Sequence, residues 1–165
     1  SIAQKKETNI TALLCKILNI FKDQNPHFQF TINKNKDKVI LKTDETLFEK
    51  IILVITENAY LYNDNLTKTL NISVEETEEN VSITFQDNGI GINPVFKEKI
   101  FKPYVRLNTL ENIPGTGIGL LKARKAAKLI NAHINLINSS NNGSIFQLSI
   151  KKYTSEENLN RLYRR

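Results

Sequence analysis

The sequence of 165 residues has no methionine and no tryptophan, and its single cysteine is Cys15. One cysteine excludes both an intrachain disulfide and a cysteine-based zinc site. Because Cys15 lies in an apolar helical pattern, we expect a buried structural thiol in a reducing, cytoplasmic setting. Because the chain begins at Ser1 and lacks methionine, we also expect a fragment excised from a longer protein.

Long apolar runs are also missing. No segment approaches the roughly 20 apolar residues that cross a bilayer, and the charged stretch 5–7 precedes an amphipathic segment rather than the apolar core of a signal peptide. We therefore expect no membrane contact by this domain, and leave open whether the full-length protein is membrane-anchored. The length and the hydrophobic content of 40% suit one globular domain.

The net charge of +6 suits an anionic ligand, but most of the charge is spread along the chain. Basic residues gather only in a predicted helix and in the C-terminal tail: Lys122, Arg124, Lys125 and Lys128, then Arg161, Arg164 and Arg165. We interpret both clusters as solvated faces and expect no nucleic-acid partner.

Glycine is scarce, and five of the six glycines lie in two short runs. The first run, at 87–92, follows an alternating apolar segment, and the second, at 115–120, leads into a helix. Glycines at such places let backbone N–H groups approach an anion closely. The two runs therefore predict a nucleotide pocket with two glycine-rich walls.

The apolar periodicity predicts alternating helices and paired strands. Helices are predicted over 8–24, 44–62, 94–100 and 119–130, and three hairpins over 28–32 with 39–42, 70–74 with 81–85, and 134–137 with 145–150. Hairpins favour a largely antiparallel sheet covered by helices on one face, an α+β fold. We expect one domain over 1–152 and a basic tail over 153–165. No Rossmann or Walker motif is present.

Three polar residues are candidates for ligand contacts, each with a structural alternative. The carboxylate of Asp87 can accept a hydrogen bond from an exocyclic amine such as that of adenine, although its immediate neighbours alone favour a plain hairpin turn. The carboxamide oxygen of Asn58 suits Mg²⁺, or a backbone contact inside a buried helix. Arg106 can approach a phosphate or form a surface salt bridge.

Taken together, the motifs resemble those of the catalytic ATP-binding domain of sensor histidine kinases, in the GHKL ATPase superfamily (HATPase_c). The resemblance covers about 10–150 and rests on an N box at 58–59, a G1 box at 87–91, an F box at 100–106, a G2 box at 115–120 and a closing hairpin at 143–146. Each motif alone is weak, but this order and spacing are specific. The F box favours histidine kinases over gyrase-, chaperone- and mismatch-repair-type relatives.

The resemblance implies a two-layer α/β sandwich with a mixed, mostly antiparallel sheet, and an ATP site under a lid at 93–114. Asp87 would bind the adenine amine, and Asn58 would bind Mg²⁺ as the catalytic residue. The implied ATP-binding residues are Asn58, Asp87, Gly89, Gly91, Ile92, Phe101, Tyr104, Arg106, Gly115, Thr116, Gly117, Ile118, Gly119 and Leu120. The γ-phosphate would pass to a histidine on a separate dimerisation domain of the same kinase, with a response regulator downstream.

Three positions depart from the family pattern. Val54 stands where an Asn, Glu or His is usual, Leu61 where a Lys or Arg is common, and Ile145 where a Thr is common. The first two departures should weaken Mg²⁺–ATP chemistry, so a degenerate, non-catalytic signalling module remains an alternative. A serine kinase of the anti-sigma type is another. No phosphoacceptor-like helix is present, so the fragment should not phosphorylate itself.

Overall fold

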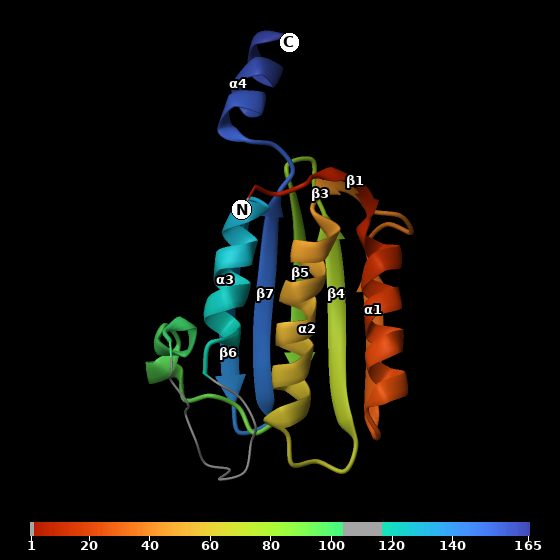
Figure 1. Ribbon diagram of the computed structural model, residues 1–165, viewed down its shortest axis with the longest axis vertical. Helices are drawn as coiled ribbons and strands as arrows, with labels where there is room; N and C mark the ends of the chain where they lie inside the picture. Colours follow the sequence, from red (N-terminus) through yellow and green to blue (C-terminus); the bar gives the residue numbers. More distant parts are fainter. Residues whose placement is uncertain (1, 104–116) are drawn as a thin grey trace.

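A computed structural model describes residues 2–103 and 117–165. Three long helices lie on one face of a five-stranded sheet, so the domain is a two-layer α/β sandwich, as expected (Figure 1). The elements are β1 (Lys6–Asn9), α1 (Ile10–Gln24), β2 (Phe28–Lys34), β3 (Ile40–Thr43), α2 (Glu45–Leu61), β4 (Lys68–Glu76), β5 (Asn80–Asp87), the 3-10 turns η1 (Pro94–Phe96) and η2 (Lys99–Phe101), α3 (Gly119–Leu129), β6 (Ala132–Ser140), β7 (Gly143–Lys151) and α4 (Ser155–Tyr163).

The sheet has the strand order β2-β4-β5-β7-β6, and all neighbours are antiparallel except β2 and β4. The predicted β4–β5 and β6–β7 hairpins are confirmed. The predicted hairpin between β2 and β3 is wrong, because β3 pairs with β1 in a separate two-stranded sheet. The chain runs from β2 through β3 and α2 before β4, and parallel strands need a long crossover of this kind.

The core lies between the sheet and the helices. Helix α2 begins after Asp44, whose Oδ1 accepts a hydrogen bond from the Leu47 N–H at 3.0 Å, and it presents Phe48, Ile51 and Ile55 to the sheet. The strands bury alternate side chains, as the β5 pattern shows, and their other face carries mostly polar residues. This alternation of apolar and polar residues is typical of an antiparallel sheet that is covered on one face only.

The expected buried thiol is wrong, because Cys15 is exposed. Leu14 and Leu18 face the core on α1, and Cys15 is one position outside that stripe, where Asn19 Nδ2 donates to its Sγ at 3.4 Å.

Helix α4 lies outside the core. It begins at a capping box between Thr154 and Glu157, has no buried residue and stands beyond one end of the sheet (Figure 1). Within 2–103 and 117–165, no helix has the length and apolar content needed to span a membrane.

Candidate nucleotide-binding site

Asp87 is the last residue of strand β5, and hydrogen bonds hold one of its two carboxylate oxygens. Its Oδ1 accepts backbone hydrogen bonds from Gly89 at 2.9 Å and from Ser144 at 3.1 Å, whereas no described residue donates to its Oδ2. Burial raises the pKa of Asp87, and the two N–H donors oppose that rise. The arrangement leaves one oxygen of a partly desolvated carboxyl group to accept a hydrogen bond from a ligand.

Glycines let the backbone of the segment after Asp87 pass close to two neighbouring carbonyl groups. A Cβ at Gly89 would overlap the Tyr62 carbonyl, and Gly91 has φ of +77° beside the Ser140 carbonyl. The segment continues into η1 rather than returning as a strand, so the plain hairpin turn is wrong. Ile90 N–H donates to Tyr62 at 3.0 Å.

The β6–β7 turn closes the other side of Asp87. Gly143 has φ of +131°, and a Cβ there would overlap the Asp87 carbonyl. Ser139 Oγ, on the same hairpin, accepts from the Ile92 N–H at 2.6 Å and lies 3.0 Å from Ser144 Oγ. The closing hairpin therefore shapes the Asp87 side of the site, a role of Gly143 and Ser144 that sequence reasoning missed.

Three asparagines tie the end of α2 to the segment after Asp87. The buried Asn63 donates through Nδ2 to Asn88 Oδ1 at 2.7 Å. Asn88 Oδ1 also accepts from Thr69 N–H at 2.9 Å, and Asn65 Nδ2 donates to the Asn88 carbonyl. In the sequence the polar stretch at 63–65 predicts only a helix stop, so this cluster was also missed.

Helices α2 and α3 meet near the second glycine run. The Cβ position of Gly119, the first residue of α3, lies 3.6 Å from Val54 Cγ1 on α2. Ile118 is the N-cap of α3 and makes no side-chain capping hydrogen bond. The start of α3 therefore keeps N–H groups that a side-chain cap would otherwise satisfy, and such groups bind anions.

Asn58 lies half-buried on α2, one turn after Val54. Its carboxamide makes no hydrogen bond with any described residue, and no group of three or more His, Cys, Asp or Glu in 2–103 and 117–165 could hold a metal. A single oxygen donor still fits Mg²⁺, which commonly keeps several waters and takes other ligands from nucleotide phosphates.

Phe101 packs into the core. Its ring is 3% exposed and lies edge-on to Phe146 at 6.5 Å. The guanidinium of Arg124 lies 3.7 Å from the Phe101 ring centroid and pairs with Glu98 at 3.3 Å. These contacts fasten η2 to α3 and β7.

The other predicted ligand residues divide into two groups. Ile92 and Leu120 are half-buried against the core, and Gly117 has φ of +74° just before α3. Four lie outside the described residues: Tyr104, Arg106, Gly115 and Thr116. The structure thus groups Asp87 with Gly89 and Gly91, and places Asn58 on the helix that meets Gly119.

Comparisons with a family model and with known proteins agree on one family. Residues 43–154 match the family model described as "Histidine kinase-, DNA gyrase B-, and HSP90-like ATPase". The sensor histidine kinase YvrG of Bacillus subtilis (strain 168) is 26% identical over 152 residues, which cover 88% of this chain and 26% of that protein. The chain therefore spans about a quarter of that relative's length.

Solved structures share the fold. The nucleotide-free catalytic domain of histidine kinase ThkA superposes with a TM-score of 0.76 and 21% identity, over 90% of this chain and 97% of that one. ThkA in complex with the response regulator protein TrrA gives a TM-score of 0.75 and 22% identity, over 90% of this chain and 42% of that one. The α+β architecture of GHKL ATPases is thereby confirmed.

Proposed function

The chain belongs to the family of histidine kinase-, DNA gyrase B- and HSP90-like ATPases, and from that premise we propose that it is the ATP-binding catalytic domain of a two-component sensor histidine kinase. In this function it binds Mg²⁺–ATP and transfers the γ-phosphate to a histidine on a separate dimerisation domain. The observation that carries the proposal is Asp87, a half-buried carboxyl group with Oδ1 held by two backbone N–H groups and Oδ2 left to a ligand.

Asp87 provides the base recognition. Its fixed Oδ2 accepts from the exocyclic amine of adenine, in a partly desolvated position where such a bond is strong. Guanine carries a carbonyl oxygen at that place, and two acceptors would face each other. Buried polar groups left unpaired in this way give strong selectivity, so the site prefers ATP to GTP.

The phosphate end lies where α2 and α3 meet. The start of α3 at Gly119 offers N–H groups and a partial positive charge to phosphate oxygens. Asn58 would hold Mg²⁺ through its carboxamide oxygen, and the ion, when bound, neutralises phosphate charge. The residues of this chain then act by orienting the nucleotide, because phosphoryl transfer depends chiefly on positioning and electrostatics.

The acceptor histidine belongs to another domain. This chain has two histidines, His27 and His133. His27 lies in the turn before β2 and His133 in β6; both are exposed, and each is followed by an apolar residue rather than an acid. The proposal therefore includes the dimerisation domain of the same kinase as phosphoacceptor and a response regulator as downstream partner. The ThkA–TrrA complex supports the second partner.

Calorimetric titration with ADP and Mg²⁺–ATP tests the proposal. Asp87→Asn keeps an oxygen for the two N–H donors but places an amide where the adenine amine must donate. We expect affinity to fall by about 10- to 100-fold, the value of a charged hydrogen bond. Asp23→Asn, at an exposed acid on α1, is the control and should bind as the wild type does. Equal heats from all three proteins would refute Asp87 as the adenine acceptor.

A degenerate, non-catalytic module is the second candidate, favoured by the apolar side chain of Val54, whose Cγ1 lies 3.6 Å from the Cβ position of Gly119 at the start of α3. A side chain that could support a metal is absent at this position. Joining the domain to its native upstream helices and supplying ATP labelled at the γ-phosphate separates the candidates. Robust labelling of histidine would exclude the degenerate module, whereas ADP binding without labelling would favour it.

A further inference from the structure

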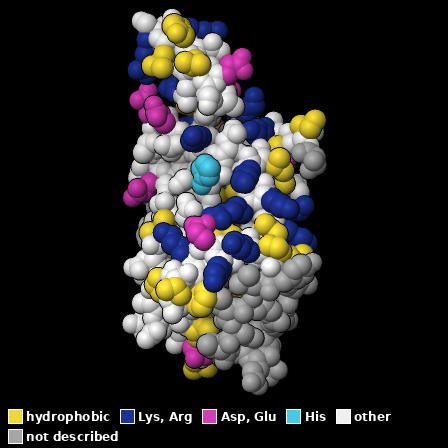
Figure 2. Space-filling view, turned by 90° about the vertical axis from the view of Figure 1, so that its left-hand side faces the viewer, with side chains coloured by type: hydrophobic (Ala, Val, Ile, Leu, Met, Phe, Trp, Pro, Cys, Tyr) yellow, Lys and Arg dark blue, Asp and Glu magenta, His cyan; other side chains and the backbone are white. Residues whose placement is uncertain are grey.

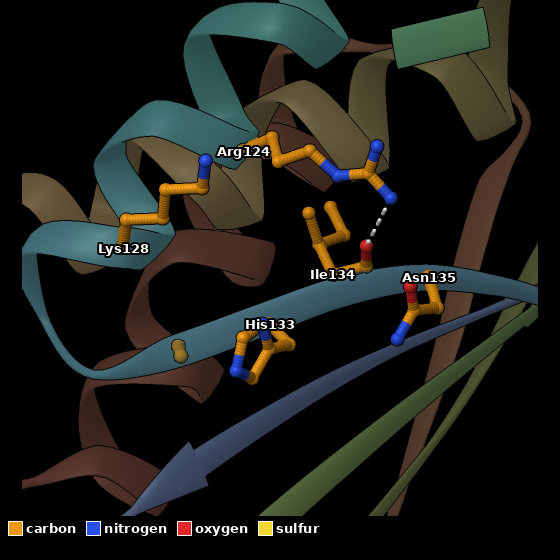
Figure 3. Close-up of a pocket in the computed structure, with 6 residues that line it drawn as sticks. Arg124, Lys128, His133, Ile134 and Asn135 are labelled. Carbon is orange, nitrogen blue, oxygen red and sulfur yellow. Dashed lines mark hydrogen bonds between the residues drawn. The ribbon is translucent and has the colours of Figure 1, made fainter. Parts of the chain in front are cut away.

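A concave feature lies between α3 and the edge strand β6. The hollow has a volume of about 250 Å³, and Figure 3 shows residues of α3 and β6 that line it. It is lined by Arg124, Lys128, Ala132, His133, Ile134 and Asn135. Lys128 lies nine residues beyond Gly119, about 13 Å along the helix axis, and Arg124 lies five residues beyond it, about 8 Å. The hollow therefore begins more than one helical turn beyond the proposed phosphate end.

The surface around this hollow is strongly basic. Helix α3 carries four of the chain's basic residues and no acid, and β6 carries no acid either. Figure 2 shows the Lys and Arg side chains gathered over this face. Among the described ion pairs, only the one between Arg124 and Glu98 offsets this charge. Helix α3 alone thus accounts for an excess of four positive charges, against a net +6 for the whole chain.

The basic residues of α3 also repel one another. Lys122 and Lys125, Lys125 and Lys128, and Arg124 and Lys128 are three or four residues apart, the spacings at which helix side chains meet. Lys128 in the last turn offsets the helix dipole, but the dipole does not favour Lys122 or Lys125. An acidic partner would relieve the repulsion.

Strand β6 is an edge strand of the sheet and borders this basic surface. It pairs with β7 on one side, and no described strand lies on its other side. The Ile134 carbonyl turns toward Arg124, whose Nη2 donates to it at 3.4 Å (Figure 3), and His133 and Asn135 are exposed beside it. The exposed edge of a sheet is a template for an extended segment of another chain.

We propose that this groove, formed by α3 and the outer edge of β6, binds an extended acidic segment of a partner protein. Carboxylates of the segment meet Arg124 and Lys128, and its backbone lies along the outer edge of β6. Of the aromatic side chains on which bases stack, the lining has only His133. Charge complementarity and the open strand edge therefore favour an acidic peptide over nucleic acid.

A labelled decapeptide of alternating glutamate and threonine is the probe, and fluorescence anisotropy is the readout. The test variant is Lys125→Glu with Lys128→Glu, neither residue being part of the proposed nucleotide site. The matched control is Lys16→Glu with Lys22→Glu, at two exposed lysines less than two turns apart on α1. At about 100 mM salt, where charges act over about 10 Å, we expect at least tenfold weaker binding for the test variant.

The control should stay within about twofold of the wild type, because it changes the net charge equally without touching the groove. Circular dichroism checks that both variants fold, and saturating ADP should leave peptide binding unchanged. Absent binding by the wild type, equal loss in both variants, displacement by ADP, or tighter binding of a single-stranded oligonucleotide of equal charge would each overturn the proposal.

Discussion

Asp87 is subject to two opposing effects. Burial raises its pKa and so disfavours the ionised form, whereas adenine recognition needs a hydrogen-bond acceptor at Oδ2. The N–H groups of Gly89 and Ser144 lower its pKa, which helps to keep the carboxylate ionised near neutral pH. A partly desolvated acid with two backbone donors and one oxygen left over is costly to the fold, and this cost points to a functional role.

The raised pKa of Asp87 predicts a pH-dependent gain in stability for Asp87→Asn. A raised native pKa means that the folded protein binds a proton more readily than the unfolded chain, so the ionised group destabilises the fold above that pKa. We expect Asp87→Asn to melt at a higher temperature than the wild type at neutral pH. The difference should narrow as the pH falls through the raised value and vanish below the ordinary pKa of about 3.9.

Thermal unfolding across this pH range measures the difference, with Asp23→Asn again as the control. Because the Asn side chain retains an oxygen for Gly89 and Ser144, the substitution keeps the local hydrogen bonds. A difference in melting temperature that stayed constant with pH would contradict the assigned role of ionisation.

The sequence predicted Asp87 and its glycines because they form a contiguous pattern. It did not predict Ser144, whose N–H donates to a residue 57 positions earlier. It also missed Asn63 and Asn88, whose side chains meet across 25 positions. Short-range patterns identify residue types suited to a ligand, but the partners that fix those residues come from distant segments. The metal and phosphate contacts of Asn58 and Gly119 stay predictions.

At the scale of elements, the asparagine cluster joins three segments. The end of α2, the start of β4 and the segment after β5 all meet at Asn88, through Asn63, Thr69 and the Thr67 carbonyl. In the same segment, the Ile90 N–H donates a hydrogen bond to the Tyr62 carbonyl. Asn88 therefore holds the segment after Asp87 in place through hydrogen bonds to the end of α2 and the start of β4.

Substitution of Asn88 by Ala should destabilise the fold. The change leaves Asn63 Nδ2, on a residue only 3% exposed, and the Thr69 N–H without their acceptor. Unpaired buried donors of this kind cost about 1–3 kcal/mol. Urea denaturation measures the loss, and ADP titration should show weaker binding as the segment loosens.

The control for this change is Asn71→Ala on the exposed face of β4, where Asn71 Oδ1 accepts from Thr31. Exposed positions usually change stability by less than about 0.5 kcal/mol. Similar losses for Asn71→Ala and Asn88→Ala would show that the cluster contributes no more than a surface contact.

Element types were easier to predict than strand partners. Helix α2 follows from its Asp44 cap and apolar run, and the β4–β5 and β6–β7 pairs follow from short turns between adjacent strands. The β2–β3 pairing failed because both strands find distant partners: β2 lies parallel to β4, and β3 joins β1. A short polar turn between two apolar segments predicts a hairpin, even where tertiary contacts pair each of the two strands with a different partner.

At the scale of the whole molecule, the two ends of the sheet have different roles. The end of β5, the segment after α2 and the β6–β7 turn meet at one end, around Asp87. Helix α4 and the strand β1 lie toward the opposite end (Figure 1). The proposed adenine contact of Asp87 therefore lies at the end of the sheet away from α4.

Removal of residues 153–165 should leave the domain folded and able to bind ADP. Helix α4 has no buried residue, and the pairs of Arg161 and Arg165 with Glu78 are surface contacts worth about 0–1 kcal/mol each. We therefore propose Lys152 as the last residue of the domain and expect its melting temperature to change by only a few degrees, roughly. Calorimetric unfolding and ADP titration check both points.

A chain that ends at Lys151 instead of Lys152 is the matched comparison for this truncation. Lys152 Nζ lies 2.6 Å from Glu76 Oε1, both side chains being mostly buried, and its backbone N–H donates to Glu79 at 2.9 Å. The Lys152 hydrogen bond, with help from Lys36, holds the pKa of Glu76 below its usual value. Ending the chain at Lys151 leaves Lys36 as the one ion-pair partner of Glu76 among the described residues. This shorter chain should therefore lose about 1–3 kcal/mol more of its free energy of unfolding than the chain that ends at Lys152. Its affinity for ADP, which we place at the far end of the sheet, should stay the same. Equal stability of the two truncated chains would place the boundary before Lys152.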